Sequence, residues 1–177
     1  TSIFAASTES TDTSVSAAAL TAVNALSDAV VTTTALSISG TFAELYEVLL
    51  ANNGQALNNQ GNVVAAAGTA LLDGLDAVNL TFTSETAEEA NILEALTTGT
   101  ITGTISNGAA SALLNSSTGV VALSRTHNLT ITVTDASVSA ANITALDAKT
   151  SGTLTINSGT VVGSASELIA AYNGGTA

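Results

Sequence analysis

The 177-residue chain contains no cysteine, methionine, tryptophan or proline, and it has one lysine, one arginine and one histidine. Without cysteine the chain has no disulfides, no thiolate nucleophile and no cysteine-ligated zinc. Two basic residues do not make a patch that binds a phosphate backbone. The single histidine, His127, excludes a metal site of several histidines and argues against a Ser-His-Asp triad. We therefore expect no enzyme and no catalytic residues.

Acidic residues dominate the charge: 14 aspartates and glutamates against two bases give a net charge of −12. Such a chain repels nucleic acid and anionic membranes and attracts divalent cations, so calcium is the candidate cofactor. The nearest approach to a membrane span, the apolar run 63–72, falls short of the roughly 18 residues required. Scarce lysine, absent cysteine and abundant threonine and serine favour a secreted or cell-surface protein. Because the first residue is Thr1, we expect a processed or excised chain.

Alanine, threonine, serine and glycine make up 96 of the 177 residues, and they recur in a pattern. Segments 11–50 and 134–173 are identical at 14 of 40 positions with a constant offset of 123 residues and no gap. A looser copy covers about 79–115, whereas 52–78 has no counterpart and 1–10 forms an N-terminal arm. We therefore predict a single repeat domain over 1–177, with copies at about 11–50, 79–115 and 128–173.

Each copy is predicted to alternate short strands with short helices. Apolar residues alternate with threonine over 129–134, which predicts a strand with Leu129, Ile131 and Val133 on one face. A helix is expected over 138–148 with Ser137 as its N-cap, then a second strand through 154 and 156 towards 161 and 162. Capping boxes begin at Thr41, Thr86 and Ser164. The insertion is predicted to be an Asn- and Gly-rich loop followed by an Ala-rich helix to about Leu72.

Strands separated by helices favour parallel pairing, and their alternating pattern predicts that one sheet face is buried. The predicted fold class is therefore α/β, as a right-handed solenoid-like repeat. Its parallel strands lie on one side and its short Ala-rich helices on the other. A compact Ala-rich α/β sandwich is the alternative.

The run from Val138-Ser139-Ala140-Ala141 to Glu167-Leu168 resembles the degenerate repeats of very long bacterial surface and type I-secreted proteins, which are common in cyanobacteria. The resemblance covers 128–173 best and 11–50 and 79–115 in part. It implies an extracellular, array-forming role like that of an adhesin or a surface layer. The calcium-binding nonapeptide Gly-Gly-x-Gly-x-Asp of many such proteins is absent.

Threonines alternate along the predicted strands, at Thr81 and Thr83, Thr100, Thr102 and Thr104, Thr130, Thr132 and Thr134, and Thr153 and Thr155. Stacked in parallel, they would form ladders about 4.8 Å apart across the strands. Such a face suits ice, a glycan or a host surface. The alternative is that threonine simply favours half-exposed strands.

Acidic side chains form three groups. Asp73 and Asp76, with Asn79 beyond them, offer oxygen ligands for calcium near a turn, or mark a helix C-terminus with a glycine cap. Asp12 and Asp135 occupy equivalent turns before helices, where such side chains bind backbone N–H groups. Four glutamates near one predicted helix start suit either acid–base chemistry or the helix dipole, namely Glu85, Glu88, Glu89 and Glu94.

The remaining polar features carry little functional signal. His127, beside Arg125, is expected in a surface loop. Glycosylation sequons occur at Asn79, Asn115, Asn128 and Asn142, about the number that chance gives for this composition.

The ends of the chain suggest an assembly. An apolar stretch at 3–5 has no predicted partner, and neither end carries a polar capping repeat. Uncapped strand edges pair with neighbours, so we expect copies of the chain to assemble head to tail, with possible donation of the N-terminal strand. The predicted function is a structural, self-assembling extracellular surface or filament protein. The alternative is a monomeric binding module that uses the Thr-lined face for ice, glycan or a host surface.

Overall fold

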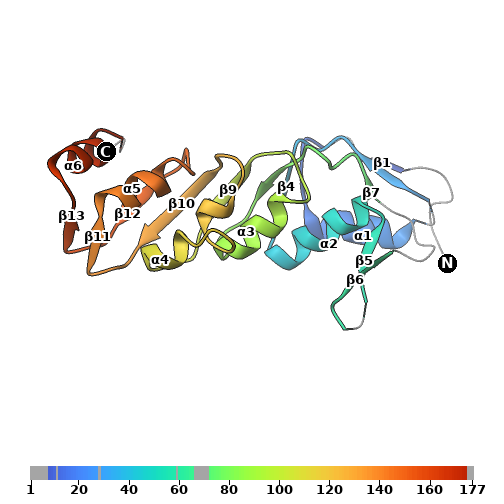
Figure 1. Cartoon of the computed structure of the whole chain (residues 1–177). Helices are drawn as coiled ribbons and strands as arrows, with labels where there is room; N and C mark the ends of the chain where they lie inside the picture. The colour runs from blue at the N-terminus through green and yellow to red at the C-terminus, as the bar shows by residue number, and fades with distance from the viewer. Residues whose placement is uncertain (1–7, 11, 28, 59, 66–71, 175–177) are drawn as a thin grey trace. The chain divides into compact units, whose positions relative to one another are not determined.

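The computed structural model describes residues 8–10, 12–27, 29–58, 60–65 and 72–174 (Figure 1). The chain is a mixed α/β protein whose strands pair mostly in parallel, as the sequence predicts. It divides into two compact units: Thr1–Thr83 with Leu93–Gly99, and Ser84–Ile92 with Thr100–Ala177. Helix α3 (Ala87–Glu94) crosses the residue boundary between them.

The first unit carries two parallel sets of strands and one antiparallel hairpin. Its helices are α1 (Ala17–Leu26) and α2 (Phe42–Asn52), which pack against each other. Its strands are β1 (Thr8–Ser10), β2 (Ser14–Ser16), β3 (Val31–Thr33), β4 (Ser37–Ser39), β5 (Gln55–Leu57), β6 (Val63–Ala65), β7 (Leu72–Asp73) and β8 (Asn79–Thr81). The orders are β1-β3-β7 and β2-β4-β8, with β5 and β6 forming the hairpin.

The second unit repeats the parallel scheme. Its strands are β9 (Ile101–Thr104), β10 (Asn128–Val133), β11 (Ser137–Ser139), β12 (Leu154–Ile156) and β13 (Thr160–Val162). Its helices are α4 (Ala110–Leu113), the 3-10 turn η1 (Val120–Ala122), α5 (Ala140–Asp147) and α6 (Ala165–Gly174), and α5 packs against α6. Strand β10 lies between β9 and β12, and β11 pairs with β13.

The number of residues between paired strand positions is the same in several strand pairs. Val31 lies opposite Thr8 and Ile38 opposite Val15, so both pairs have the same sequence offset. The second unit keeps this offset, since Leu154 lies opposite Ile131 and Val161 opposite Val138. The insertion lengthens one interval: Leu72 lies opposite Val31, much further along the chain, and yet the next strands still pair in parallel.

Equivalent positions of the first and last copies share their local geometry. Ser16 caps α1 and Ser139 caps α5, both at φ −80° and ψ 145°, and each hydroxyl accepts the N–H three residues ahead at 3.2 Å. Ser164 and Glu167 bond to each other reciprocally at the start of α6, as Thr41 and Glu44 do at the start of α2. The capping boxes are therefore confirmed, including the one at Thr86.

The core of each unit lies on the inward face of its strands. Along β10, Leu129, Ile131 and Val133 are buried while Thr130 and Thr132 are half-exposed, which confirms the predicted alternation. In the first unit the buried side chains come from strands and helices alike, and they include Leu20, Ile38, Leu45, Leu49 and Leu80. Burial of such side chains is the main favourable term in folding.

Two corners are closed by a Thr-x-Gly sequence, at 97–99 and 150–152. The Thr150 hydroxyl donates to the carbonyl of Leu129 and accepts the N–H groups of Leu129 and Gly152, at 2.9 and 2.8 Å. Thr97 likewise donates to the carbonyl of Val78 and accepts the N–H of Gly99. The hydroxyl thus replaces a neighbouring strand at a point where the chain turns, so the buried backbone groups stay bonded.

Predictions for the insertion and for one helix N-cap were wrong. Within the predicted loop of the insertion, Gln55–Leu57 is β5. The Ala-rich helix is absent where the structure describes its predicted start: Val63–Ala65 is β6, and Figure 1 shows the hairpin projecting from its unit. β-branched Val63 and Val64 favour a strand, and the Asn58 carboxamide accepts two N–H groups in the turn. Residues 66–71 lie outside the described residues. Helix α5 is capped by Ser139 rather than Ser137, because strand β11 extends from Ser137 to Ser139 and the helix begins only at Ala140.

Candidate functional site

The two predicted calcium ligands have other partners. The Asp73 carboxylate accepts the N–H of Gly74 at 2.8 Å, and Asp76 accepts the side-chain amide of Asn52 at 2.7 Å. Asp73 ends a strand rather than a helix, so the helix-cap interpretation was wrong. Gly74 has φ +94°, and a side chain there would overlap the carbonyl of Thr33. The Asp-Gly pair therefore forms a tight turn after β7.

Two other acidic side chains, Glu89 and Asp135, bind backbone N–H groups at helix starts. The Glu89 carboxylate accepts the N–H of Thr86 at 2.8 Å, so it closes a capping box. Asp135 accepts the N–H of Ala110 at 2.6 Å and so binds the start of α4, 25 residues away. Over the residues that the structure describes, no three histidine, aspartate or glutamate side chains gather as a metal site.

His127 is buried, at 1 % exposure, which corrects its predicted place in a surface loop. Its Nδ1 accepts the N–H of Ile101 at 3.1 Å, and its backbone bonds to Lys149 and Ser151. These contacts make His127 part of the interior of the second unit. A ring nitrogen that accepts a backbone N–H serves the fold and is not available to a substrate.

The threonines of the second unit form short ladders. Thr104 lies opposite Thr130 between β9 and β10, and Thr132 lies opposite Thr155 between β10 and β12. Thr102, however, lies opposite Asn128, so the ladder is interrupted. Of the sequon asparagines, Asn142 is half-buried and the other three are exposed, namely Asn79, Asn115 and Asn128.

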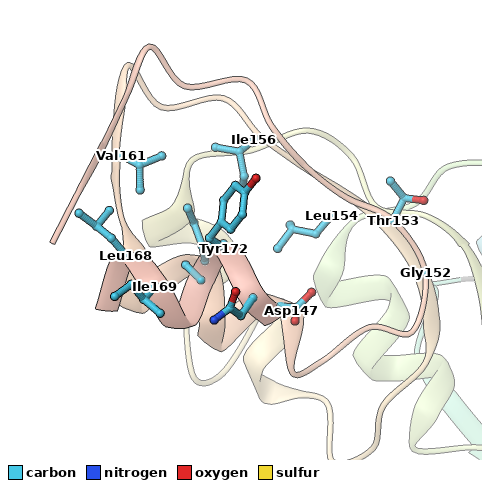
Figure 2. A pocket seen from close by; sticks show the side chains of 12 residues that line it. Asp147, Gly152, Thr153, Leu154, Ile156, Val161, Leu168, Ile169 and Tyr172 are labelled. Carbon is cyan, nitrogen blue, oxygen red and sulfur yellow. The ribbon is translucent and has the colours of Figure 1, made fainter. Parts of the chain in front are cut away.

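A concave apolar site lies at the C-terminal edge of the second unit, between α5, α6, β12 and β13. The hollow has a volume of about 790 Å³. Figure 2 shows Leu154, Ile156 and Tyr172 gathered around it, with Val161 and Leu168 on its other side. Asp147 contributes the one acidic side chain to its lining.

This edge is unusual because α6 buries none of its residues. Val161, Leu168 and Ile169 are exposed, and Tyr172 is 86 % exposed. The sequence did not indicate this site, because the site consists of the apolar residue types that form an ordinary core.

Comparison with known proteins gives no relative: no protein-family model, curated protein or solved structure matches the chain. Among the residues described, no helix is long and apolar enough to cross a membrane. The apolar edge is the candidate functional surface, because α6 buries none of its residues and its large apolar side chains are exposed.

Proposed function

We propose that the chain is a structural protein that self-assembles outside the cell into a surface array or filament, without catalytic activity. Its fold is a right-handed solenoid-like repeat in which each coil lies on the one before. The strand offset, which is the same in both units, supports this description. In a solenoid each coil contacts its neighbours, so an end coil exposes apolar surface unless something covers it.

The observation that carries the proposal is a comparison between the two ends of the repeat. Val161 and Leu168 are exposed, whereas their equivalents in the first copy, Ile38 and Leu45, are completely buried. Ile38 is buried because β8 pairs alongside it and places Leu80 opposite. Strand β13 pairs with β11 on one edge and, among the described residues, with no strand on the other. The last coil thus presents a face that this fold elsewhere covers with another coil.

The acidic, cysteine-free and lysine-poor composition supports an extracellular location. Net charge of −12 keeps single chains soluble and makes association dependent on ionic strength. Calcium, which reduces the repulsion between acidic chains, is expected to promote assembly.

The test is sedimentation velocity and electron microscopy of the purified chain over a range of concentrations, with and without calcium. We expect ordered polymers that Val161→Glu abolishes. Val64→Glu is the matched control, because Val64 in β6 is as exposed as Val161, 40 % against 39 %, but lies on the hairpin. A wild-type chain that stays monomeric at all concentrations would contradict the proposal.

The second candidate function is a monomeric module that binds ice, glycan or a host surface through the threonine ladders. The pairs Thr104–Thr130 and Thr132–Thr155 favour it. A monodisperse monomer with thermal hysteresis, lost on substitution of Thr130 and Thr132, would support this candidate.

A further inference from the structure

We propose that the C-terminal edge, formed by β12, β13 and α6, binds the N-terminal edge of a second copy, formed by β1, β2 and α1. The two copies join by parallel strand addition, with Val161 opposite Val15 and Leu154 opposite Thr8. This inference rests on the proposed self-assembly and names the surfaces that perform it.

Strand spacing matches at the two edges. At the N-terminal edge β2 begins six residues after β1, from Thr8 to Ser14. At the C-terminal edge β13 begins six residues after β12, from Leu154 to Thr160. Within the chain, β1 pairs with β3 and β2 pairs with β4, and the same number of residues separates the partners in both pairs. Both strands of one copy can therefore pair with both strands of another in a single register, as strand addition requires.

Each of the two edges has a valine that is not fully buried, Val15 at one and Val161 at the other. Val138 of β11 is 3 % exposed, whereas Val15, its equivalent in β2, is half-buried. Val161 occupies the same position in β13 and is exposed. When β2 lies beside β13, Val15 and Val161 face each other on the inner side of the sheet, as Val15 and Ile38 do within one chain.

The helices continue in the same way. Helix α1 packs against α2, and α5 packs against α6. A docked α1 would lie beside α6 and cover Leu168 and Tyr172, which border the hollow. Helix α1 carries no charged side chain in its first or last turn and is rich in alanine, so it can approach α6 closely. A second copy of the chain thus supplies what the last coil lacks.

The absence of cysteine from the chain allows a direct test by disulfide cross-linking. Neighbouring strands lie about 4.8 Å apart, within the Cα separation that a disulfide spans. We expect an oxidised mixture of the single variants Val15→Cys and Val161→Cys to give the mixed dimer in large excess over both homodimers. Random collision would give a statistical mixture.

Two matched mixtures control the register and the surface. Ser14→Cys with Val161→Cys should give little mixed dimer, because adjacent strand residues point to opposite faces. Val64→Cys with Val161→Cys should give only the statistical mixture. Circular dichroism of each reduced variant verifies that the fold is retained.

The outcomes separate this inference from the proposal on which it rests. If the wild-type chain polymerises but the Val15–Val161 mixture links no better than the Val64 control, the assembly stands and these two edges are wrong. Dominant Val161 homodimers would indicate a tail-to-tail contact and would overturn the inference as well. If the wild-type chain never assembles and the mixed dimer does not form, both fail.

Discussion

The Thr-x-Gly corner at 150–152 yields the sharpest prediction about stability. Replacing Thr150 by valine preserves the shape of the side chain and removes its hydroxyl. Thr150 is buried, and that hydroxyl bonds the N–H and carbonyl of Leu129 and the N–H of Gly152. The substitution leaves the buried N–H and carbonyl of Leu129 without this partner, and it also removes the bond to the half-buried N–H of Gly152.

The magnitude follows from the number of groups. A buried donor or acceptor left unbonded costs about 1–3 kcal/mol, so the low end of that range gives about 2 kcal/mol for the two buried groups of Leu129. Thr150→Ser keeps the hydroxyl and loses one methyl group, which costs about 1 kcal/mol. Thr132→Val alters a half-exposed position in the middle of β10 and should change stability by less than about 0.5 kcal/mol.

Urea unfolding followed by far-ultraviolet circular dichroism, at a concentration where the chain is monomeric, measures the difference. With a slope of about 2 kcal/mol per molar urea, Thr150→Val should lower the midpoint by about 1 M. The reasoning would be refuted if Thr150→Val were no less stable than Thr150→Ser. In that case the corner would be held by packing, and the hydroxyl would contribute nothing.

Three further predictions concern other backbone and capping contacts. Gly99→Ala places a methyl group against the carbonyl of Val78 and should lower the free energy of unfolding by about 1–3 kcal/mol. Gly163→Ala should lower it less, because its new methyl group lies 3.1 Å from the nearest side-chain atom. Thermal unfolding compares the two variants. His127→Leu leaves a buried N–H of β9 without its acceptor and should cost about 1–3 kcal/mol in the same assay. Glu44 and Glu167 accept hydrogen bonds from Thr41 and Ser164, and these bonds lower the pKa of both glutamates below the ordinary value of 4.5. The bonds from the backbone N–H groups contribute most, and those from the hydroxyls contribute less. The two capping boxes therefore stabilise the fold fully above pH 4.5 and lose that contribution as the pH falls through the lowered pKa values. A titration of stability against pH should show this loss in the wild type and not in the Glu44→Gln/Glu167→Gln double variant.

The features that the sequence predicted correctly depend on neighbouring residues. The alternation at Leu129, Ile131 and Val133 specifies which face of β10 is buried wherever that strand lies. Capping boxes join residues three positions apart, so Thr41 and Glu44 could be identified without knowledge of the rest of the fold.

The errors concern residues whose structure depends on distant partners. Ser137 is a plausible N-cap by sequence, but its pairing with Thr160 keeps it in a strand, and the helix starts later. His127 lies in a polar segment that indicates a turn, but its ring is buried and accepts the N–H of Ile101, 26 residues earlier. Local patterns contain neither pairing.

The candidate site could not be predicted for a different reason. Its residues, such as Val161 and Leu168, have the same chemistry as the buried Ile38 and Leu45. Only the structure shows that a strand covers one pair and that none of the described strands covers the other.

The β5–β6 hairpin has a consequence for how such a chain can vary. It makes the interval from β3 to β7 far longer than the interval from β1 to β3, and β7 nevertheless pairs with β3 in parallel. Sequence can therefore be added at this point without altering the parallel pairing of the strands. A peptide grafted between Leu57 and Val63 would lengthen the hairpin and leave the parallel pairing of β3 with β7 in place, which makes the hairpin a natural position for sequence diversity.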